Sequence, residues 1–311
     1  SGFQEWNYLD AGASFKSTLG ALTGLTFSGS GDMDNGIGYS VKYTFEGGDE
    51  AGHAVTFDLG GGLKLGIGYD QSYGIETVKA ISPYVNNRRA DITGAHRGLP
   101  TAARKPLGPD VWDTSSGENA IGLSFKNDLA AISFGFTPVR DVNTSTDEIA
   151  ASSATSSEYG TASSIGVKLT PVDGLTIGFG TSSEESDATA NSDPKGTTIG
   201  FQYKIGSFAI GYQEIENIID SVASTEDSVE IQEGGIAYKV NDALTIGVFA
   251  ANINYLTVNT DNGVETGMGI VQVGYNLGPA VIQYDYADGS DLNSTKDTEY
   301  EIHKVKIKVL F

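Results

Sequence analysis

The sequence predicts an all-β protein whose strands form an antiparallel meander, and three observations lead to this prediction. Large apolar residues alternate with small or polar residues over many short segments, which is the period of a strand. One phrase recurs, an aliphatic residue, a small residue and then an aromatic or aliphatic residue, as in Ile67-Gly68-Tyr69 and Ile199-Gly200-Phe201. From Glu118 onward, short and long connections alternate along the chain.

The predicted strands follow this alternation in order. They cover residues 21–30, 36–46, 53–59, 63–70, 118–126, 130–137, 162–170, 174–182, 196–205, 207–214, 229–240, 243–252, 265–277, 279–287 and 299–311. Residues 1–20 are expected to supply one further strand, for about 16 in all. Short connections such as Asn127-Asp128-Leu129 alternate with long ones such as 138–161, which are rich in Ser, Thr, Asp and Glu. Short turns at one end and long polar loops at the other predict an up-and-down barrel.

Residues 71–117 interrupt the pattern. This stretch holds four of the chain's eight prolines and four of its five arginines. A connection of this length inside a compact domain is usually functional or disordered. Apolar residues such as Tyr84, Val85, Leu99 and Trp112 favour a folded insert over a disordered one.

Composition excludes several classes of protein. The formal net charge of -21 and the sequence pI of about 4.3 argue against nucleic acid as a partner. The lack of cysteine excludes a disulfide framework and a cysteine-ligated metal. No apolar run approaches the roughly 20 residues of a membrane helix, and no signal peptide is recognisable, so we expect either a mature chain or one made without a leader. The three histidines, His53, His96 and His303, are far apart, and no catalytic motif is found, so we expect no enzyme.

The positions of the lysines indicate which face of the strands meets water. Lysines fall on the small and polar side of their strands, opposite the large apolar residues. They are Lys42, Lys64, Lys126, Lys168, Lys204, Lys304, Lys306 and Lys308. In a soluble protein these lysines would be a solvated outer face, and in a membrane barrel they would line the interior. Sixteen strands enclose a lumen too wide for side chains to fill, which favours a transmembrane barrel with an aqueous channel.

The chain resembles a general porin of the Gram-negative bacterial outer membrane, of the 16-stranded trimeric kind. The final strand alternates Val305, Ile307 and Val309 and ends in Phe311, which resembles the terminal signal read by the outer-membrane assembly machinery. Residues 71–117 resemble the third loop of porins, which folds into the barrel and narrows it. The resemblance implies one transmembrane barrel domain over residues 1–311, integral to the outer membrane, with the insert in its lumen. It also implies a homotrimer in contact with the lipid bilayer and lipopolysaccharide, and a water-filled channel for passive diffusion of ions and small hydrophilic solutes.

Within that architecture, the charges of the insert become candidates for the pore constriction. They are Lys79, Arg88, Arg89, Arg97, Arg104 and Lys105, with Asp91, Asp110 and Asp113. The candidate lumen wall is Lys42, Lys64, Lys126, Lys304, Lys306 and Lys308. Porins of this kind typically carry acidic residues on the third loop, so an arginine-rich loop is a departure, and we expect a basic constriction that favours anions. The arginines have an alternative role, which is to pair with the aspartates and hold the loop in shape.

Other readings remain open. One is a substrate-selective porin whose arginines bind an anion such as phosphate or a carboxylate. Others are a surface adhesin or structural barrel with a plugged lumen, and a soluble β protein. No cofactor is expected, although divalent cations such as Ca²⁺ at acidic outer loops are an alternative to loops that simply carry charge for solubility. The acidic segments concerned are 184–187, Asp220 with Glu226 and Asp227, and Asp288 with Asp291.

Overall fold

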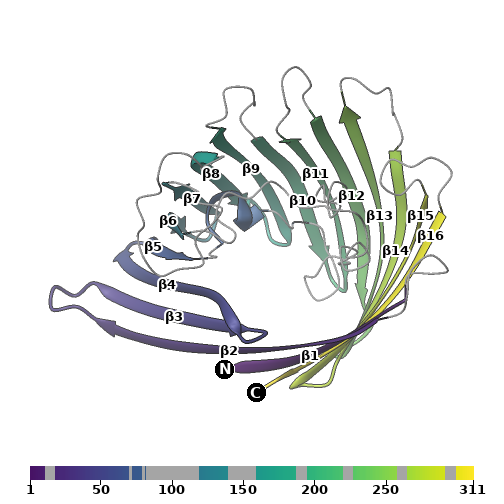
Figure 1. Ribbon diagram of the computed structural model, residues 1–311, viewed down its shortest axis with the longest axis horizontal. Helices are drawn as coiled ribbons and strands as arrows, with labels where there is room; N and C mark the ends of the chain where they lie inside the picture. Colours follow the sequence, from purple (N-terminus) through teal and green to yellow (C-terminus); the bar gives the residue numbers. More distant parts are fainter. Residues whose placement is uncertain are drawn as a thin grey trace.

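The computed structural model describes residues 1–10, 18–69, 72–78, 81, 119–138, 159–186, 195–219, 227–257, 265–290 and 299–311. Their strands form one closed antiparallel barrel, in which each strand pairs with its sequence neighbours and β1 pairs with β16 (Figure 1). Within these ranges, no helix is long and apolar enough to cross a membrane. The prediction of a barrel of 16 antiparallel strands is confirmed.

All fifteen predicted strands are present, together with one near the amino terminus. The strands are β1 (Gly2–Asp10), β2 (Thr18–Asp32), β3 (Gly38–Glu46), β4 (Asp49–Gly60), β5 (Leu63–Tyr69), β6 (Asn119–Lys126), β7 (Ala130–Thr137), β8 (Tyr159–Leu169), β9 (Leu175–Ser186), β10 (Lys195–Ile205), β11 (Phe208–Ile219), β12 (Asp227–Lys239), β13 (Leu244–Thr257), β14 (Glu265–Asn276), β15 (Ala280–Ser290) and β16 (Glu299–Leu310). A short 3₁₀ segment, η1 (Gly74–Val78), lies in the insert.

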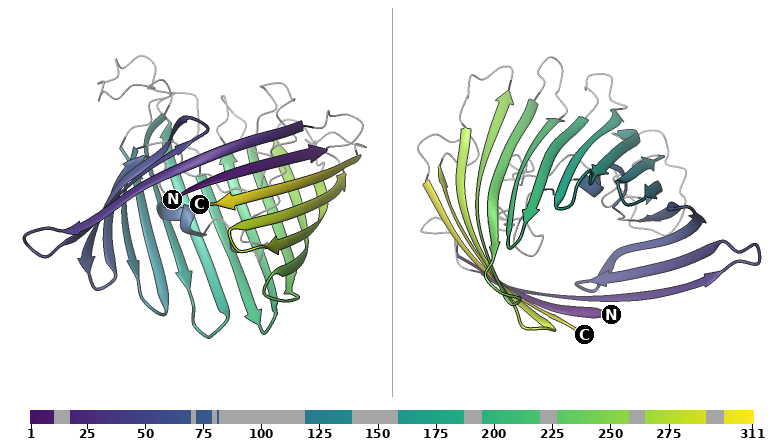
Figure 2. Two further views of the ribbon diagram at one scale, coloured as in Figure 1. Left: turned by 90° about the horizontal axis from the view of Figure 1, so that it is seen from below. Right: turned by 180° about the vertical axis from the view of Figure 1, so that it is seen from behind.

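The two ends of the chain close the barrel. The Gly2 N–H donates to the Phe311 carbonyl at 2.8 Å, and the Phe311 N–H donates to the Gly2 carbonyl at 3.1 Å. From there the β1–β16 ladder continues from Phe3 opposite Leu310 to Asp10 opposite His303. Figures 1 and 2 show the two termini side by side. Closure leaves no sheet edge, which is what a β structure in lipid requires.

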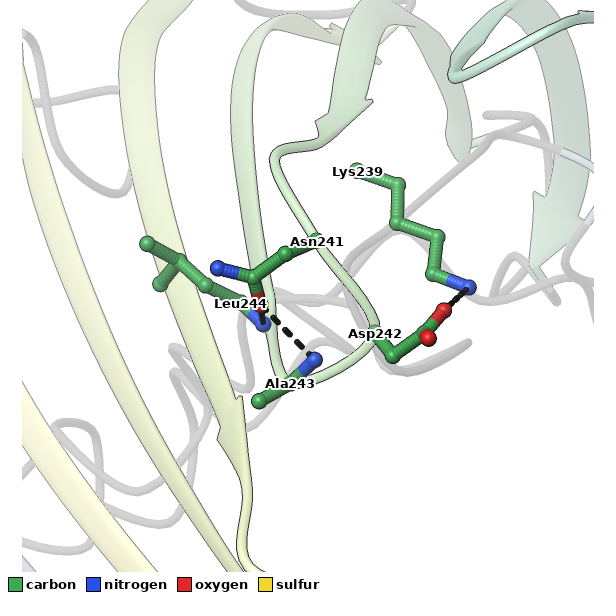
Figure 3. Close-up of polar contacts among 5 residues, drawn as sticks. All are labelled: Lys239, Asn241, Asp242, Ala243 and Leu244. Atoms are coloured by element: carbon green, nitrogen blue, oxygen red, sulfur yellow. Dashed lines mark hydrogen bonds and ion pairs between the residues drawn. The ribbon is translucent and has the colours of Figure 1, made fainter.

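Asparagine side chains shape the short turns. Between β12 and β13 the Asn241 carboxamide oxygen accepts hydrogen bonds from the Ala243 and Leu244 N–H groups, each at 2.9 Å (Figure 3). In the same turn the Lys239 ammonium lies 2.8 Å from the Asp242 carboxylate. The hydrogen bond and the positive charge of Lys239 lower the pKa of Asp242, which stays ionised at neutral pH. An asparagine that bonds the backbone two or three residues ahead fixes a tight turn locally.

Three strands extend further toward the long loops than the sequence predicts. β9, β11 and β13 end at Ser186, Ile219 and Thr257, four or five residues beyond the predicted ends. Their ladders continue through Glu216 opposite Glu230 and Asn254 opposite Glu265. In these extensions, outward apolar residues no longer alternate regularly with inward small or polar residues. The pattern used for prediction therefore ends before the strand does.

Large apolar side chains cover one face of the wall. Exposed residues of this kind include Phe27, Val41, Leu123, Phe134, Ile165, Phe179, Ile199, Phe201, Ile210, Ile236, Val248, Val271 and Ile307. Each follows the period-2 alternation of its strand, with small or polar residues between. A continuous apolar outer face is what a barrel presents to lipid.

A charge on this outer face is expected to destabilise the barrel. We predict that Ile199→Arg lowers the free energy of unfolding in lipid vesicles by about 2–4 kcal/mol, because the guanidinium would have to enter hydrocarbon. Ser40→Arg, a change at an exposed position of the opposite face, serves as control and is expected to change it by less than about 1 kcal/mol. Denaturant unfolding followed by tryptophan fluorescence measures both. Equal losses for the two variants would show that the faces are wrongly assigned.

Candidate functional site: the lumen wall and the base of the insert

The insert begins against a row of glycines on the wall. η1 contacts β7, β8 and β9. A side chain at Gly122 would collide with the Tyr73 ring, one at Gly166 with the Gly74 carbonyl, and one at Gly178 with Ile81. The small residue of the recurring sequence phrase therefore makes room for the insert, and this is the reason for glycine at positions where a strand would otherwise prefer a larger residue.

Polar wall residues hold the same segment by its backbone. The Ser133 hydroxyl accepts from the Gly74 N–H at 2.9 Å. The Gln213 side chain bridges the segment, because its oxygen accepts from the Ile81 N–H at 2.9 Å and its nitrogen donates to the Val78 carbonyl at 3.0 Å. Gln202 donates to the Ile81 carbonyl at 3.1 Å. Two glutamines on β10 and β11 thus satisfy backbone groups that have no strand partner.

These contacts define the inner face of the wall. The insert meets the glycines and the small polar residues, so the residues two and four positions away on the same strands also face the lumen. By this alternation the inner face carries nine lysines, which are Lys42, Lys64, Lys126, Lys168, Lys204, Lys239, Lys304, Lys306 and Lys308. All six candidate wall lysines are among them. Lys195, at the start of β10, lies on the outer face with Ile199.

The lysines of β16 are engaged with neighbours. Lys306 forms an ion pair with Glu5 of β1 at 3.2 Å, and both side chains are largely buried. The Lys308 ammonium lies 3.8 Å from the centre of the Phe3 ring, a cation–π contact. Lys304 is buried opposite Asp285, whose carboxylate accepts from Gln272 at 3.0 Å and from Gln283 at 2.9 Å. This network joins β14, β15, β16 and β1 across the seam of the barrel.

Carboxylates are distributed differently from lysines. On the outer face they gather at the loop end of β9, β11, β12, β14, β15 and β16, as Glu185, Glu214, Glu216, Glu230, Glu265, Asp288, Glu299 and Glu301. Of the acidic residues expected in outer loops, Glu184 and Glu185 instead lie in β9, Asp227 in β12 and Asp288 in β15. Glu184 faces inward and is 1% exposed. The described residues contain no group of three acidic or histidine side chains that could hold a metal ion.

Sequence reasoning missed an apolar area on the inner wall. At the loop end of β11 to β16, nine inward residues are at most 7% exposed, and we call them the inner apolar patch: Ile215, Ile231, Phe249, Ala251, Ile253, Met268, Ile270, Ala287 and Ile302. Ile215, Ile231 and Ile253 are directly opposite one another on three strands. The predicted inner face was polar throughout, which is wrong for this part of the wall. The sequence contains a pattern that could have predicted this patch. Glu214 and Glu216 flank Ile215, so the charged residues take the outer face and the apolar residue the inner face.

The candidate constriction residues lie outside the described residues. This applies to Lys79, Arg88, Arg89, Arg97, Arg104, Lys105, Asp91, Asp110 and Asp113. Of the insert, the structure describes residues 72–78 and 81. They run along the inner wall from the carboxyl end of β5 to β11.

Comparison with solved structures shows the same fold in porins. An anion-selective porin from Comamonas acidovorans superimposes with a TM-score of 0.70 at 11% identity, covering 100% of this chain and 99% of that chain. A porin refined at 1.8 Å resolution gives 0.68 at 14% identity, covering 100% and 98%. OmpT of Vibrio cholerae, in vitro folded and in trimer form, gives 0.63 at 12% identity, covering 99% and 97%. No curated protein sequence matches the chain.

These structures show only the fold, because their sequences are distant, and a family model shows the family. The model described as Gram-negative porin matches residues 2–292, nearly the whole chain. Porins of this family are barrels integral to the outer membrane, and their work is passive diffusion, without a catalytic step. With its sixteen strands, apolar outer face and inward-folded insert base, the chain belongs to the Gram-negative porin family and forms an outer-membrane channel for passive diffusion.

Proposed function

We propose that this porin favours small anions over cations, through a basic constriction. The observation that carries the proposal is the inward position of nine of the ten lysines in the described strands. A narrow passage with low-dielectric walls focuses the field of the charges that line it and enriches the opposite ion. The acidic net charge of -21 does not oppose this, because many of the strand carboxylates lie on the outer face at the loop end.

Seven carboxylates with described side chains also face inward on the strands, so the nine inner lysines exceed them by two; they are Glu5, Asp32, Glu46, Asp58, Glu184, Glu233 and Asp285. Glu5 is neutralised by Lys306. Glu184 and Glu233 are each 1% exposed, and Asp285 is 6% exposed, so they have little contact with water in the lumen. Lysines near the turns, Lys64 and Lys126 among them, are exposed.

We further propose that residues 71–117 cross the lumen and form the constriction. Two observations support this course. The described part of the insert ends at Ile81, hydrogen-bonded to Gln202 and Gln213 on β10 and β11. The inner apolar patch begins on β11, next to that anchor, and is shielded from water. The apolar residues Tyr84, Val85, Leu99, Val111 and Trp112 suit this patch, which would leave Arg88, Arg89, Arg97 and Arg104 to face the pore.

The comparisons add support for two features. The Comamonas acidovorans porin with the same fold is described as anion-selective, and the Vibrio cholerae protein was obtained as a trimer. We propose that this chain also forms a homotrimer. Phe311, which is 70% exposed at the carboxyl terminus, is proposed to be read by the assembly machinery before the barrel closes.

Ion selectivity tests the proposal directly. In a planar bilayer with a KCl gradient, the reversal potential is expected to have the sign of a chloride-preferring channel. Changing Arg88, Arg89, Arg97 and Arg104 together to Gln should reduce that preference, since four fixed positive charges leave the constriction. Lys195→Gln, on the outer face, should leave the reversal potential unchanged. Cation preference in the unaltered protein would overturn the proposal, and absence of open steps would favour a plugged structural barrel.

The seat of the insert can be tested through one glycine. Gly122→Val places a side chain against the Tyr73 ring, so we expect the insert base to move and the single-channel conductance to change. The overpacking should also cost about 1–3 kcal/mol of unfolding free energy. The control is Gly269→Val, at a position with open space around its Cβ, which should alter neither quantity measurably. Unchanged conductance in Gly122→Val would mean that the insert base does not set the size of the passage.

A further inference from the structure

A cavity of about 480 Å³ lies on the inner wall beside η1, toward the short turns. Its lining includes two lysines, three hydroxyl-bearing residues and one acidic residue of the β6–β7 turn, namely Lys64, Lys126, Thr77, Ser124, Ser133 and Asp128. Thr77 comes from η1 and the other five from the wall and its turn. The cavity is therefore bounded by the base of the insert on one side and by β5, β6 and β7 on the other.

The strand register places a third lysine, Lys168, beside the two lysines that line the cavity. Lys64 of β5 is opposite Ser124, two residues before Lys126 on the same face of β6, so the two lysines are diagonal neighbours about 7–8 Å apart. Lys126 is opposite Ala131 of β7, which is in turn opposite Lys168 of β8. Lys126 and Lys168 are thus separated in the ladder by Ala131 alone, whose side chain is a single methyl group.

Within the described part of the chain, no carboxylate lies within ion-pair distance of these three lysines. This contrasts with Lys306, paired to Glu5, and Lys239, paired to Asp242. Asp58 lies opposite Lys64 on β4 and Asp128 lines the cavity, but neither carboxylate forms an ion pair with these lysines among the described residues. Three lysines on one part of the inner wall repel one another, and an anion bound between Lys64 and Lys126 would reduce that repulsion.

We propose that this cavity binds an oxyanion with two negative charges, of the phosphate type. Lysine ammonium groups bind phosphate as point charges, and the surrounding hydroxyls supply directed donors to its several oxygens. Ser133 accepts the Gly74 N–H, which leaves its own proton to donate. A single chloride would leave most of the cavity and these donors unused. The site lies outside the proposed constriction, on its turn side.

This inference rests on the proposed anion preference and adds a substrate class to it. An anion that has passed the insert would pause at the cavity before it leaves at the turn end. Conduction requires that such binding be favourable enough to enter and weak enough to leave. The site would thus act as a low-affinity station that gives phosphate-type solutes a saturable passage, whereas chloride passes without saturation over the same range.

The test is a titration of inorganic phosphate into a planar bilayer that carries chloride current, at constant ionic strength. Phosphate is expected to reduce the chloride current along a saturating curve. Lys126→Gln should raise the half-saturating phosphate concentration about tenfold, as expected for the loss of one charge-assisted contact. Lys126→Arg should keep it close to the original value. Lys204→Gln removes an inner lysine of β10 outside the cavity, so it should weaken anion preference and leave the half-saturating concentration unchanged.

The outcomes separate this inference from the proposed function. A chloride-preferring channel whose current falls without saturation, or in which Lys204→Gln acts like Lys126→Gln, overturns the phosphate site and leaves anion preference standing. A cation-preferring reversal potential in KCl alone overturns the proposed function, whatever phosphate does. Isothermal titration of phosphate into the folded porin in detergent, compared with Lys168→Gln, decides the case if Lys126→Gln yields no channels, and absence of binding heat in the unaltered porin counts against the site.

Discussion

Every backbone polar group of this protein that lies in lipid must find its partner within the chain, and the closed ladder of sixteen strands is the solution. The constraint is most visible at the seam. Gly2 and Phe311 exchange their backbone hydrogen bonds, and β1 pairs along its length with β16. Side chains reinforce the same seam from inside, where the Glu5–Lys306 ion pair and the Lys308–Phe3 contact connect the first strand to the last. Closure of the ladder creates the lumen, and the inner side chains and the base of the insert line it.

Much of the fold could be read from the sequence because a wall one sheet thick sorts its residues by parity alone. Lipid on one side and water on the other impose a strict alternation, and residues such as Ile199 and Lys204 reveal their faces without any knowledge of contacts. The base of the insert was less predictable. Nothing in the sequence shows that Gln213 spans Val78 and Ile81, or that Gly122 and Gly166 are small because Tyr73 and Gly74 press against them. Those facts depend on partners more than forty residues away.

The recurring glycines are unfavourable within their own strands but are required by contacts with the base of the insert. Glycine is a poor strand former, so its repetition on β5, β6, β8 and β9 costs stability within each strand. This cost is offset on the inner face of the wall, where Ile75 and Val78 of the insert base are completely buried against the glycines. The wall and the base of the insert are therefore adjusted to each other, since β9 supplies small residues and β10 and β11 supply the glutamines that hydrogen-bond its backbone.

The reversal of pattern near the long loops has a consequence for how the protein sits in its bilayer. On β11 the outward residues change from Ile210 and Tyr212 to Glu214 and Glu216, while the inward residues change from Gly211 and Gln213 to the buried Ile215. On the turn side of this point the apolar side chains face outward, as in a membrane protein. On the loop side they face inward, as in a water-soluble protein. Comparable changes occur on β12, β13 and β15, so the points of reversal mark a boundary along this side of the barrel. That boundary fixes how deeply this side of the barrel is immersed in the bilayer, because each outward residue on it must match either hydrocarbon or water.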